Sequence, residues 1–156
     1  MSSFDQSGDQ LKRAHAIRHV GIECEKAGRL EEAEKHYDEA RALYREHSTE
    51  DDLNYANAVR YPAAIKNRLG KSAESEALWR EAMDRYEKVG IADGIVEGKL
   101  HLANFAIDRG DLTTARSWFE QANIAAAGSE SRESHDFIAK VKTRLKDAEN
   151  AGKEGR

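Results

Sequence analysis

Apolar and small residues recur along the chain at the spacing of one α-helical turn. On either side of Gly28 they stand three or four positions apart, which places them on one face of a helix. Upstream they are Ile17, Val20, Gly21 and Cys24, and downstream they are Leu30, Ala33, Tyr37, Ala40 and Leu43. A glycine adopts the left-handed backbone that ends a helix at little cost. The pattern therefore predicts two helices joined at Gly28.

The same pattern returns twice, with offsets of 42 and 40 residues between the copies. The repeated glycines are Gly28, Gly70 and Gly110, and the aromatics that keep these offsets are Tyr37, Trp79 and Phe119. One helical hairpin cannot bury both of its apolar faces alone, so the repetition predicts neighbouring hairpins that share a core. We expect small residues such as Ala33 to let paired helices approach closely. The ring of Tyr37 then fills the space between hairpins.

Turn and capping signals set the expected boundaries. We expect repeats at about 9–47, 50–88 and 92–127, a capping helix at 130–149, and disordered tails at 1–8 and 151–156. Residues 9–150 would then form a single domain. Ser48 or Thr49, and later Asp93, are the expected helix N-caps. The capping helix is predicted by one apolar stripe on an otherwise charged segment, namely Phe137, Ile138, Val141, Leu145 and Ala148. This stripe would cover the last hairpin.

Composition narrows the class of protein. The 156 residues are 39% hydrophobic and 35% charged with a single proline, which favours a soluble, highly helical chain. The net charge of -4 disfavours binding to nucleic acids or anionic membranes. No apolar run reaches membrane-spanning length, and we expect a cytoplasmic location. Cys24 is the only cysteine, so no internal disulfide is expected, and its place on the apolar stripe favours core packing over a reactive thiol.

These repeats resemble the tetratricopeptide repeat family over roughly residues 13–127. The resemblance rests on Val20, Gly21, Gly28, Ala33, Tyr37 and Ala40, and on Leu102, Ala103, Gly110, Ala115, Phe119 and Ala122. The period of about 40–42 residues is similar to that of the longer variant found in kinesin light chains and bacterial scaffold proteins. The resemblance implies an all-α fold, a right-handed α-α superhelix of three hairpins with a C-terminal capping helix.

The middle copy departs from the family pattern at Pro62, Lys66 and Ser75. A proline inside a helix removes one hydrogen bond and clashes with the preceding turn. We therefore predict a kink near residues 58–61, with one residue looped out, so that Ile65 enters the core in place of Lys66. Pro62 is open to two interpretations, a tolerated irregularity or a device that widens the binding groove.

The resemblance also implies where a partner would bind. In this family the first helices of the hairpins line a concave groove that receives a peptide. The corresponding residues are His15, Arg18, His19, Ile22, Asn57, Arg60, Tyr61, Asn67, Arg68, His101 and Asn104. Arginine forks and asparagine amides are suited to carboxylates and main-chain amides. The hypothesis is a protein–protein interaction scaffold that binds an acidic or C-terminal peptide. The alternative is that these residues are ordinary solvated helix faces.

The sequence also bears on other functions. Chaperone-tail receptors of the family clamp a terminal carboxylate, but the corresponding positions here include Glu97, which would repel it. The alternative function is a self-assembly module, because the two ends of an open row of hairpins can bind further copies of the chain. We expect a monomer or a weak homo-oligomer. His15, His19 and Glu23 lie at four-residue steps and suggest a less favoured metal site. No motif predicts a catalytic centre, so we expect no enzyme activity and no cofactor.

Overall fold

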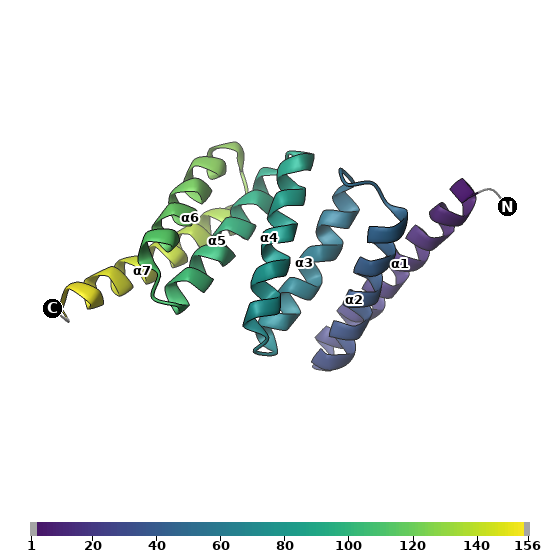
Figure 1. The fold of residues 1–156 in the computed structure, drawn as a ribbon, viewed down its shortest axis with the longest axis horizontal. Helices are drawn as coiled ribbons and strands as arrows, with labels where there is room; N and C mark the ends of the chain where they lie inside the picture. The colour runs from purple at the N-terminus through teal and green to yellow at the C-terminus, as the bar shows by residue number, and fades with distance from the viewer. Residues whose placement is uncertain (1–2, 155–156) are drawn as a thin grey trace. The chain divides into compact units, whose positions relative to one another are not determined.

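The computed structural model describes residues 3–154, and it describes the side chains of residues 6–153. All regular structure in this part of the chain is helical (Figure 1). The elements are α1 (Ser3–Lys26), α2 (Leu30–His47), α3 (Leu53–Arg68), α4 (Ser72–Val89), α5 (Ala92–Asp108), α6 (Leu112–Ala125), the 3-10 helix η1 (Ala126–Gly128) and α7 (Arg132–Glu154). The all-α class and the helical-repeat pattern are confirmed.

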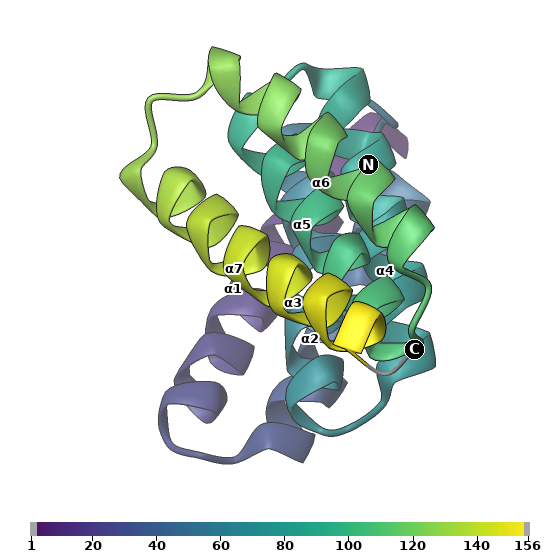
Figure 2. The same cartoon turned by 90° about the vertical axis from the view of Figure 1, so that its left-hand side faces the viewer.

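Contacts divide the chain into two compact units, with the boundary along the sequence between Val89 and Gly90, where the sequence predicts one domain. Unit 1 holds the hairpins α1–α2 and α3–α4, and α2 also contacts α3. Unit 2 holds the hairpin α5–α6 with α7 packed against both of its helices (Figure 2). The division has a physical basis in unit 2, because α7 completes an apolar core with α5 and α6.

Three glycines end the first helices as the repeat predicts. Gly28, Gly70 and Gly110 have φ angles of +80°, +78° and +76°. At the first of them, the backbone N–H of Arg29 donates to the carbonyl of Cys24 at 2.9 Å. This bond satisfies a carbonyl that the helix end would otherwise leave unpaired. The equivalent bonds at the other two turns are 2.8 and 2.9 Å long.

Small residues allow close helix packing within the first hairpin. A Cβ atom added to Gly21 would lie 2.7 Å from Cε1 of Tyr37, nearer than real Cβ contacts occur. Ala33 and Ala40 are buried, and so is the Tyr37 ring. Tyr37 also packs with Ile65 of the next hairpin. The predicted roles of the small residues and of this aromatic ring are confirmed.

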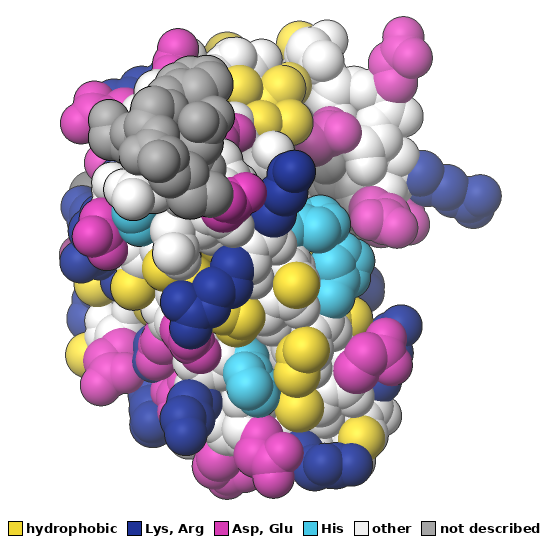
Figure 3. All heavy atoms as spheres, turned by 90° about the vertical axis from the view of Figure 1, so that its right-hand side faces the viewer, with side chains coloured by type: hydrophobic (Ala, Val, Ile, Leu, Met, Phe, Trp, Pro, Cys, Tyr) yellow, Lys and Arg dark blue, Asp and Glu magenta, His cyan; other side chains and the backbone are white. Residues whose placement is uncertain are grey.

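The buried stripe of α1 is offset from the expected one. Ala14, Arg18 and Gly21 are buried, whereas Val20 keeps 48% of its surface exposed. Cys24 is half-buried and packs against the cluster of Ala33, Tyr37 and Ile65, in line with its predicted packing role. The main neighbour of α1 is α2, so its outer side stays open. Hydrophobic side chains are therefore visible among charged ones at the α1 end of the chain (Figure 3).

Helix α3 accommodates Pro62 without the predicted looped-out residue, because the helix runs uninterrupted from Leu53 to Arg68. Ile65 is fully buried, as predicted. Lys66 is also buried and is not displaced from the interior. Its Nζ lies 2.9 Å from Glu34 Oε2 and 3.0 Å from Asp38 Oδ2. The displacement of Lys66 was thus wrongly predicted, because acidic side chains of α2 compensate its burial.

Ser75, which replaces the repeated alanine, is fully buried. Its Oγ donates to the carbonyl of Ala63 at 2.7 Å. A buried hydroxyl needs such a partner. The small site therefore accepts serine as well as alanine.

The helix ends differ from the expected boundaries. Residues 3–8 belong to α1 and residues 151–154 to α7, so neither expected tail is disordered where the structure describes it. Residues 1, 2, 155 and 156 of those tails lie outside the described part. Ser7 Oγ lies 3.4 Å from His47 Nδ1 and ties the start of α1 to the end of α2. Arg116 forms an ion pair with Glu149, which holds the last turns of α7 on α6.

Two N-caps also differ from the prediction. Asp52 caps α3 by accepting from the backbone N–H of Asn54 at 2.8 Å, and Ser48 donates to Asp52 at 2.7 Å. A carboxylate beside the helix start is the better acceptor, so Ser48 supports the cap instead of forming it. Helix α5 begins after Ile91, which leaves Asp93 in its first turn.

Unit 2 has the core that the stripe on α7 predicts. Ile138, Val141 and Leu145 are buried in one cluster with residues of α5 and α6, among them Leu100 and Phe119. The predicted capping role of this helix within its unit is confirmed. No helix in the described residues is long and apolar enough to cross a membrane.

Candidate functional site

Some of the predicted binding residues of unit 1 lie together on a face formed by α1 and α3, called here the α1–α3 face. Cζ of Arg18 lies 5.6 Å from the centre of the Tyr61 ring, and Cζ of Arg60 lies 5.9 Å from it. The Tyr61 ring itself packs 5.2 Å from the ring of Tyr37. Cations at these distances are attracted to an aromatic face. Arg18, Arg60 and Tyr61 therefore form one cluster that places two positive charges beside a single ring.

Arg18 is unusual for a charged residue because only 9% of its surface is exposed. Its Nη2 lies 3.1 Å from Nδ1 of His15. Its Nε and Nη1 are buried and have no hydrogen-bond partner in the described structure. Buried charged donors that lack acceptors are costly, so an added acceptor would be favourable here.

The hydrogen bonds around Arg18 fix the tautomers of two histidines. An arginine only donates, so Nδ1 of His15 accepts from Arg18 and its Nε2 carries the proton. That Nε2 lies 3.0 Å from Nε2 of His19, which must then accept. A partial loss of hydration lowers the pKa of His15, and so do the charge of Arg18 and the charge that His19 carries when it is protonated. In this arrangement the Nε2–H of His15 donates a hydrogen bond to Nε2 of His19.

His15 also borders a pocket of about 300 Å³. It is lined by Leu11, Lys12, His15, Tyr44, Asp52 and Asn54. Burial raises the pKa of the Tyr44 hydroxyl, the charge of Arg18 opposes that rise, and Asp52 adds to it. The electrostatic influence of Arg18 thus reaches the wall of the pocket. Asp52 is already the acceptor for Ser48 and for the start of α3.

Several predicted residues of unit 1 are engaged elsewhere. Nη1 of Arg68 pairs with Oε2 of Glu25 at 2.8 Å. The Tyr86 hydroxyl donates to Oδ1 of Asn57 at 2.5 Å. Ile22 is half-buried against the core cluster of the first hairpin, and Asn67 is exposed. The α1–α3 face therefore centres on Arg18, His15 and Tyr61, while Arg68 is neutralised within the chain.

The predicted residues of unit 2 contact α7. The His101 ring lies 4.9 Å from the ring of Phe137 in an edge-on arrangement. Oδ1 of Asn104 accepts from Nη1 of Arg144 at 3.0 Å, and Arg144 also pairs with Asp108. These side chains hold the C-terminal helix. Their polar groups are used inside unit 2.

Glu23, the third residue of the possible metal site with His15 and His19, is engaged in an ion pair. Glu23 pairs with Lys26 at 3.4 Å. Across the described residues there is no group of three or more histidine, cysteine, aspartate or glutamate side chains placed to hold a metal ion.

The sequence reasoning missed the pocket residues Lys12, Tyr44 and Asn54. One signal was available for Tyr44, because it lies four residues after Ala40 and continues the apolar period of α2. Lys12 and Asn54 carried no such signal. Only the packing of both α1 and α3 against α2 brings them to one pocket.

No protein-family model matches the sequence, and no curated protein matches it. Among solved structures, the fold is similar to the N-terminal domain of stress-induced protein-1 (STI-1) from C. elegans. The TM-score is 0.63 and the identity is 19%, and the match covers 85% of this chain and 97% of that domain. At this identity the likeness shows the fold alone. The chain therefore has the helical-repeat fold of tetratricopeptide-like domains.

Proposed function

We propose that the chain is a non-enzymatic interaction scaffold that binds an acidic segment of a protein partner on the α1–α3 face of unit 1. Domains with this helical-repeat fold typically serve protein interaction. The observation that carries the proposal is Arg18, a nearly buried cation with two donors that lack acceptors. A carboxylate from outside the chain supplies the missing acceptor.

The surroundings of Arg18 favour a carboxylate over a cationic or apolar group. Arg60 and Lys12 add positive charge near the same face, while the chain as a whole carries a net charge of -4. Planar guanidinium groups match carboxylates with paired hydrogen bonds. The half-buried ring of Tyr61 adds area for the aliphatic part of a glutamate. The net charge of -4 disfavours nucleic acid as the partner. The proposed partner is therefore a protein, and the proposed location is the cytoplasm.

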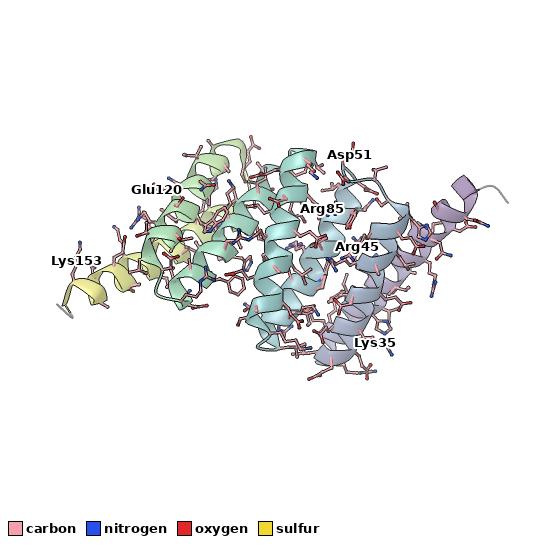
Figure 4. The ribbon with its side chains drawn as sticks, viewed as in Figure 1. Lys35, Arg45, Asp51, Arg85, Glu120 and Lys153 are labelled. Atoms are coloured by element: carbon pink, nitrogen blue, oxygen red, sulfur yellow. The ribbon has the colours of Figure 1, made fainter. Side chains whose placement is uncertain are left out.

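The test uses fluorescently labelled hexaglutamate, with hexaglutamine as the uncharged comparison. We expect hexaglutamate alone to bind, followed by fluorescence anisotropy. Replacing both Arg18 and Arg60 by alanine should weaken binding by about tenfold or more, since hydrogen bonds to charged groups contribute about 1.5–3 kcal/mol each. The matched control is Arg45→Ala on α2, an exposed arginine labelled in Figure 4.

Three results would contradict the proposal. They are no binding of hexaglutamate, equal binding of hexaglutamine, or an equal loss in the Arg45→Ala protein. Circular dichroism melts of each variant separate lost binding from lost folding. Raising the salt concentration should also weaken the complex, because exposed parts of the contact are screened.

Self-assembly is the second candidate, favoured by the exposure of Val20 on α1 and of Ile124 on α6, which reaches 76%. Exposed apolar residues on open hairpin sides promote association of copies. Light scattering at two protein concentrations tests this candidate. A molar mass that stays at one chain at both concentrations would remove it, and a rise that Val20→Ser abolishes would support it.

A further inference from the structure

We infer that binding of the acidic segment is coupled to proton uptake by His15, which releases Arg18 from its hydrogen bond with His15 so that both residues hold one carboxylate. This inference rests on the proposed function of the α1–α3 face. It adds a regulatory property, namely tighter binding in mild acid.

Protonation of His15 changes which hydrogen bonds its ring can form. In the free protein Nδ1 of His15 accepts from Nη2 of Arg18 at 3.1 Å. A protonated imidazole has two N–H donors and no acceptor. Protonation therefore removes this hydrogen bond and places two cations side by side. Arg18 then has no hydrogen-bond acceptor among the partners that the structure gives it.

A carboxylate that enters the pocket supplies acceptors for His15 and Arg18. His15 lines the pocket, and its Nδ1 lies 3.1 Å from Nη2 of Arg18. One carboxylate has two oxygens, so it can accept from His15 and from Arg18 together. The negative charge also relieves the repulsion between the two cations. Protonated His15 is thus disfavoured in the free protein and favoured in the complex.

Charged and titratable groups from several elements lie near His15. On α1 these are Lys12, Arg18 and His19, on α2 it is Tyr44, and in the connection to α3 it is Asp52. The pocket residue from α3 is Asn54, which carries no charge. Lys12 and Arg18 oppose protonation of His15, and Asp52 is engaged by Ser48 and Asn54. The incoming carboxylate is therefore the group that changes the balance.

The affinity for the acidic segment should depend on pH. The pKa of His15 lies below its ordinary value of 6.5 in the free protein, and the bound carboxylate raises it. A group whose pKa is higher in the complex takes up a proton on binding, so affinity rises as pH falls between the two values. Affinity should fall again in stronger acid, where the ligand's own carboxylates become protonated, at about pH 4.

Isothermal titration of hexaglutamate into the intact protein tests the inference. Titrations at about pH 6.5 in two buffers with different ionisation enthalpies give the number of protons taken up. We expect uptake of a sizeable fraction of one proton, and about threefold to tenfold tighter binding on going from about pH 7.5 to about pH 5.5. The variant His15→Gln keeps an acceptor for Arg18 but cannot be protonated, so both effects should disappear.

The matched control is His36→Gln on α2, which should retain proton uptake and the pH dependence. Subtracting the His15→Gln result removes protons bound by the peptide itself. Binding without proton uptake, or equal uptake by the His15→Gln protein, would overturn the inference and leave the proposed function standing. Absence of hexaglutamate binding at every pH would overturn both. The two failures are therefore distinguishable.

Discussion

In unit 1, the junction between the first and second hairpins contains Lys66 of α3, whose ammonium lies between Glu34 and Asp38 of α2. In unit 2, the corresponding position against the hairpin α5–α6 is taken by α7, which inserts Val141 and Leu145 into an apolar core. Both junctions cover a hairpin that has an apolar side. The first does so with buried charge in addition to apolar packing, and the second does so mainly with apolar side chains.

The comparison shows what each kind of junction depends on. Side chains of Lys66 and Glu34 are only 10% and 12% exposed, so their attraction is weakly screened but their loss of hydration is large. Lys71 also pairs with Glu34 at 2.9 Å. An apolar junction depends on packed volume and hardly on pH. Unit 1 should therefore respond to acid and to charge changes, and unit 2 to cavities.

A second charged group in unit 1 follows the same principle. Arg41 of α2 pairs with Glu81 of α4 at 2.6 Å, and Glu81 also pairs with Arg85 at 3.4 Å. Cζ of Arg85, labelled in Figure 4, lies 3.6 Å from the centre of the Tyr55 ring. The second helices of unit 1 are thus joined to one another by charge.

The largest effect is expected from Leu145→Ala, which empties a fully buried site in the core of unit 2. Such truncations cost about 2–5 kcal/mol. Each unit carries one tryptophan, Trp79 in unit 1 and Trp118 in unit 2. Urea denaturation of single-tryptophan variants therefore reports each unit. The midpoint from Trp118 should fall much more than that from Trp79, and equal shifts would contradict a core confined to unit 2.

The second effect is expected from Lys66→Met, which keeps the packing volume and removes the cation. Glu34 then retains Lys71, and Asp38 is 46% exposed, so we expect a loss of about 1–3 kcal/mol, less than for a fully isolated buried pair. The Trp79 signal measures it. A Lys66→Met protein as stable as the parent would show that burial of the cation offsets the whole attraction.

Acid provides the control for that variant. Burial alone would raise the pKa of Glu34, but hydrogen bonds from Lys66 and Lys71 outweigh it and lower the pKa below its ordinary value of 4.5. A carboxyl with a lowered pKa stabilises the fold above that value, and the stabilisation is lost as pH falls through the folded pKa. The difference between the parent and Lys66→Met should therefore shrink below about pH 4. A constant difference would contradict the assignment to Glu34.

The smallest effect is expected from Gly21→Ala in the first hairpin. The added methyl group lies 2.7 Å from the Tyr37 ring, and overpacking of this kind costs about 1–3 kcal/mol. The better helix propensity of alanine returns about 1 kcal/mol. Gly8→Ala is the matched control, because nothing lies within 4 Å of its Cβ position. Thermal denaturation should show a lower midpoint for Gly21→Ala only, and similar midpoints for both variants would contradict the close contact.

The repeat made most of the fold predictable. Glycine spacing located the three turns, because each requires a positive φ that few other residues adopt. Alanine and aromatic positions located the hairpin contacts, because side-chain volume limits how near two helices come. The stripe on residues 137–148 located the helix that covers the last hairpin. These features are local in sequence, so periodicity alone carries them.

The site was less predictable because it depends on partners far apart in sequence. Arg18 resembles a solvated residue until Tyr61 and His15 are placed around it. Lys66 resembles an error in an apolar stripe until Glu34 and Asp38 compensate its charge. His101 and Asn104 were expected in the groove, but α7 uses them. Charge compensation across helices leaves no periodic signal in one sequence.

Binding of the acidic segment by Arg18 is tested by following the Nε–H resonance of Arg18 in NMR spectra as hexaglutamate is added. We expect a large, saturable shift for Arg18 and none for Arg45, since the buried Nε of Arg18 gains an acceptor on binding. An unchanged Arg18 resonance at a peptide concentration that saturates binding would contradict the account, because the acidic segment would then be held elsewhere.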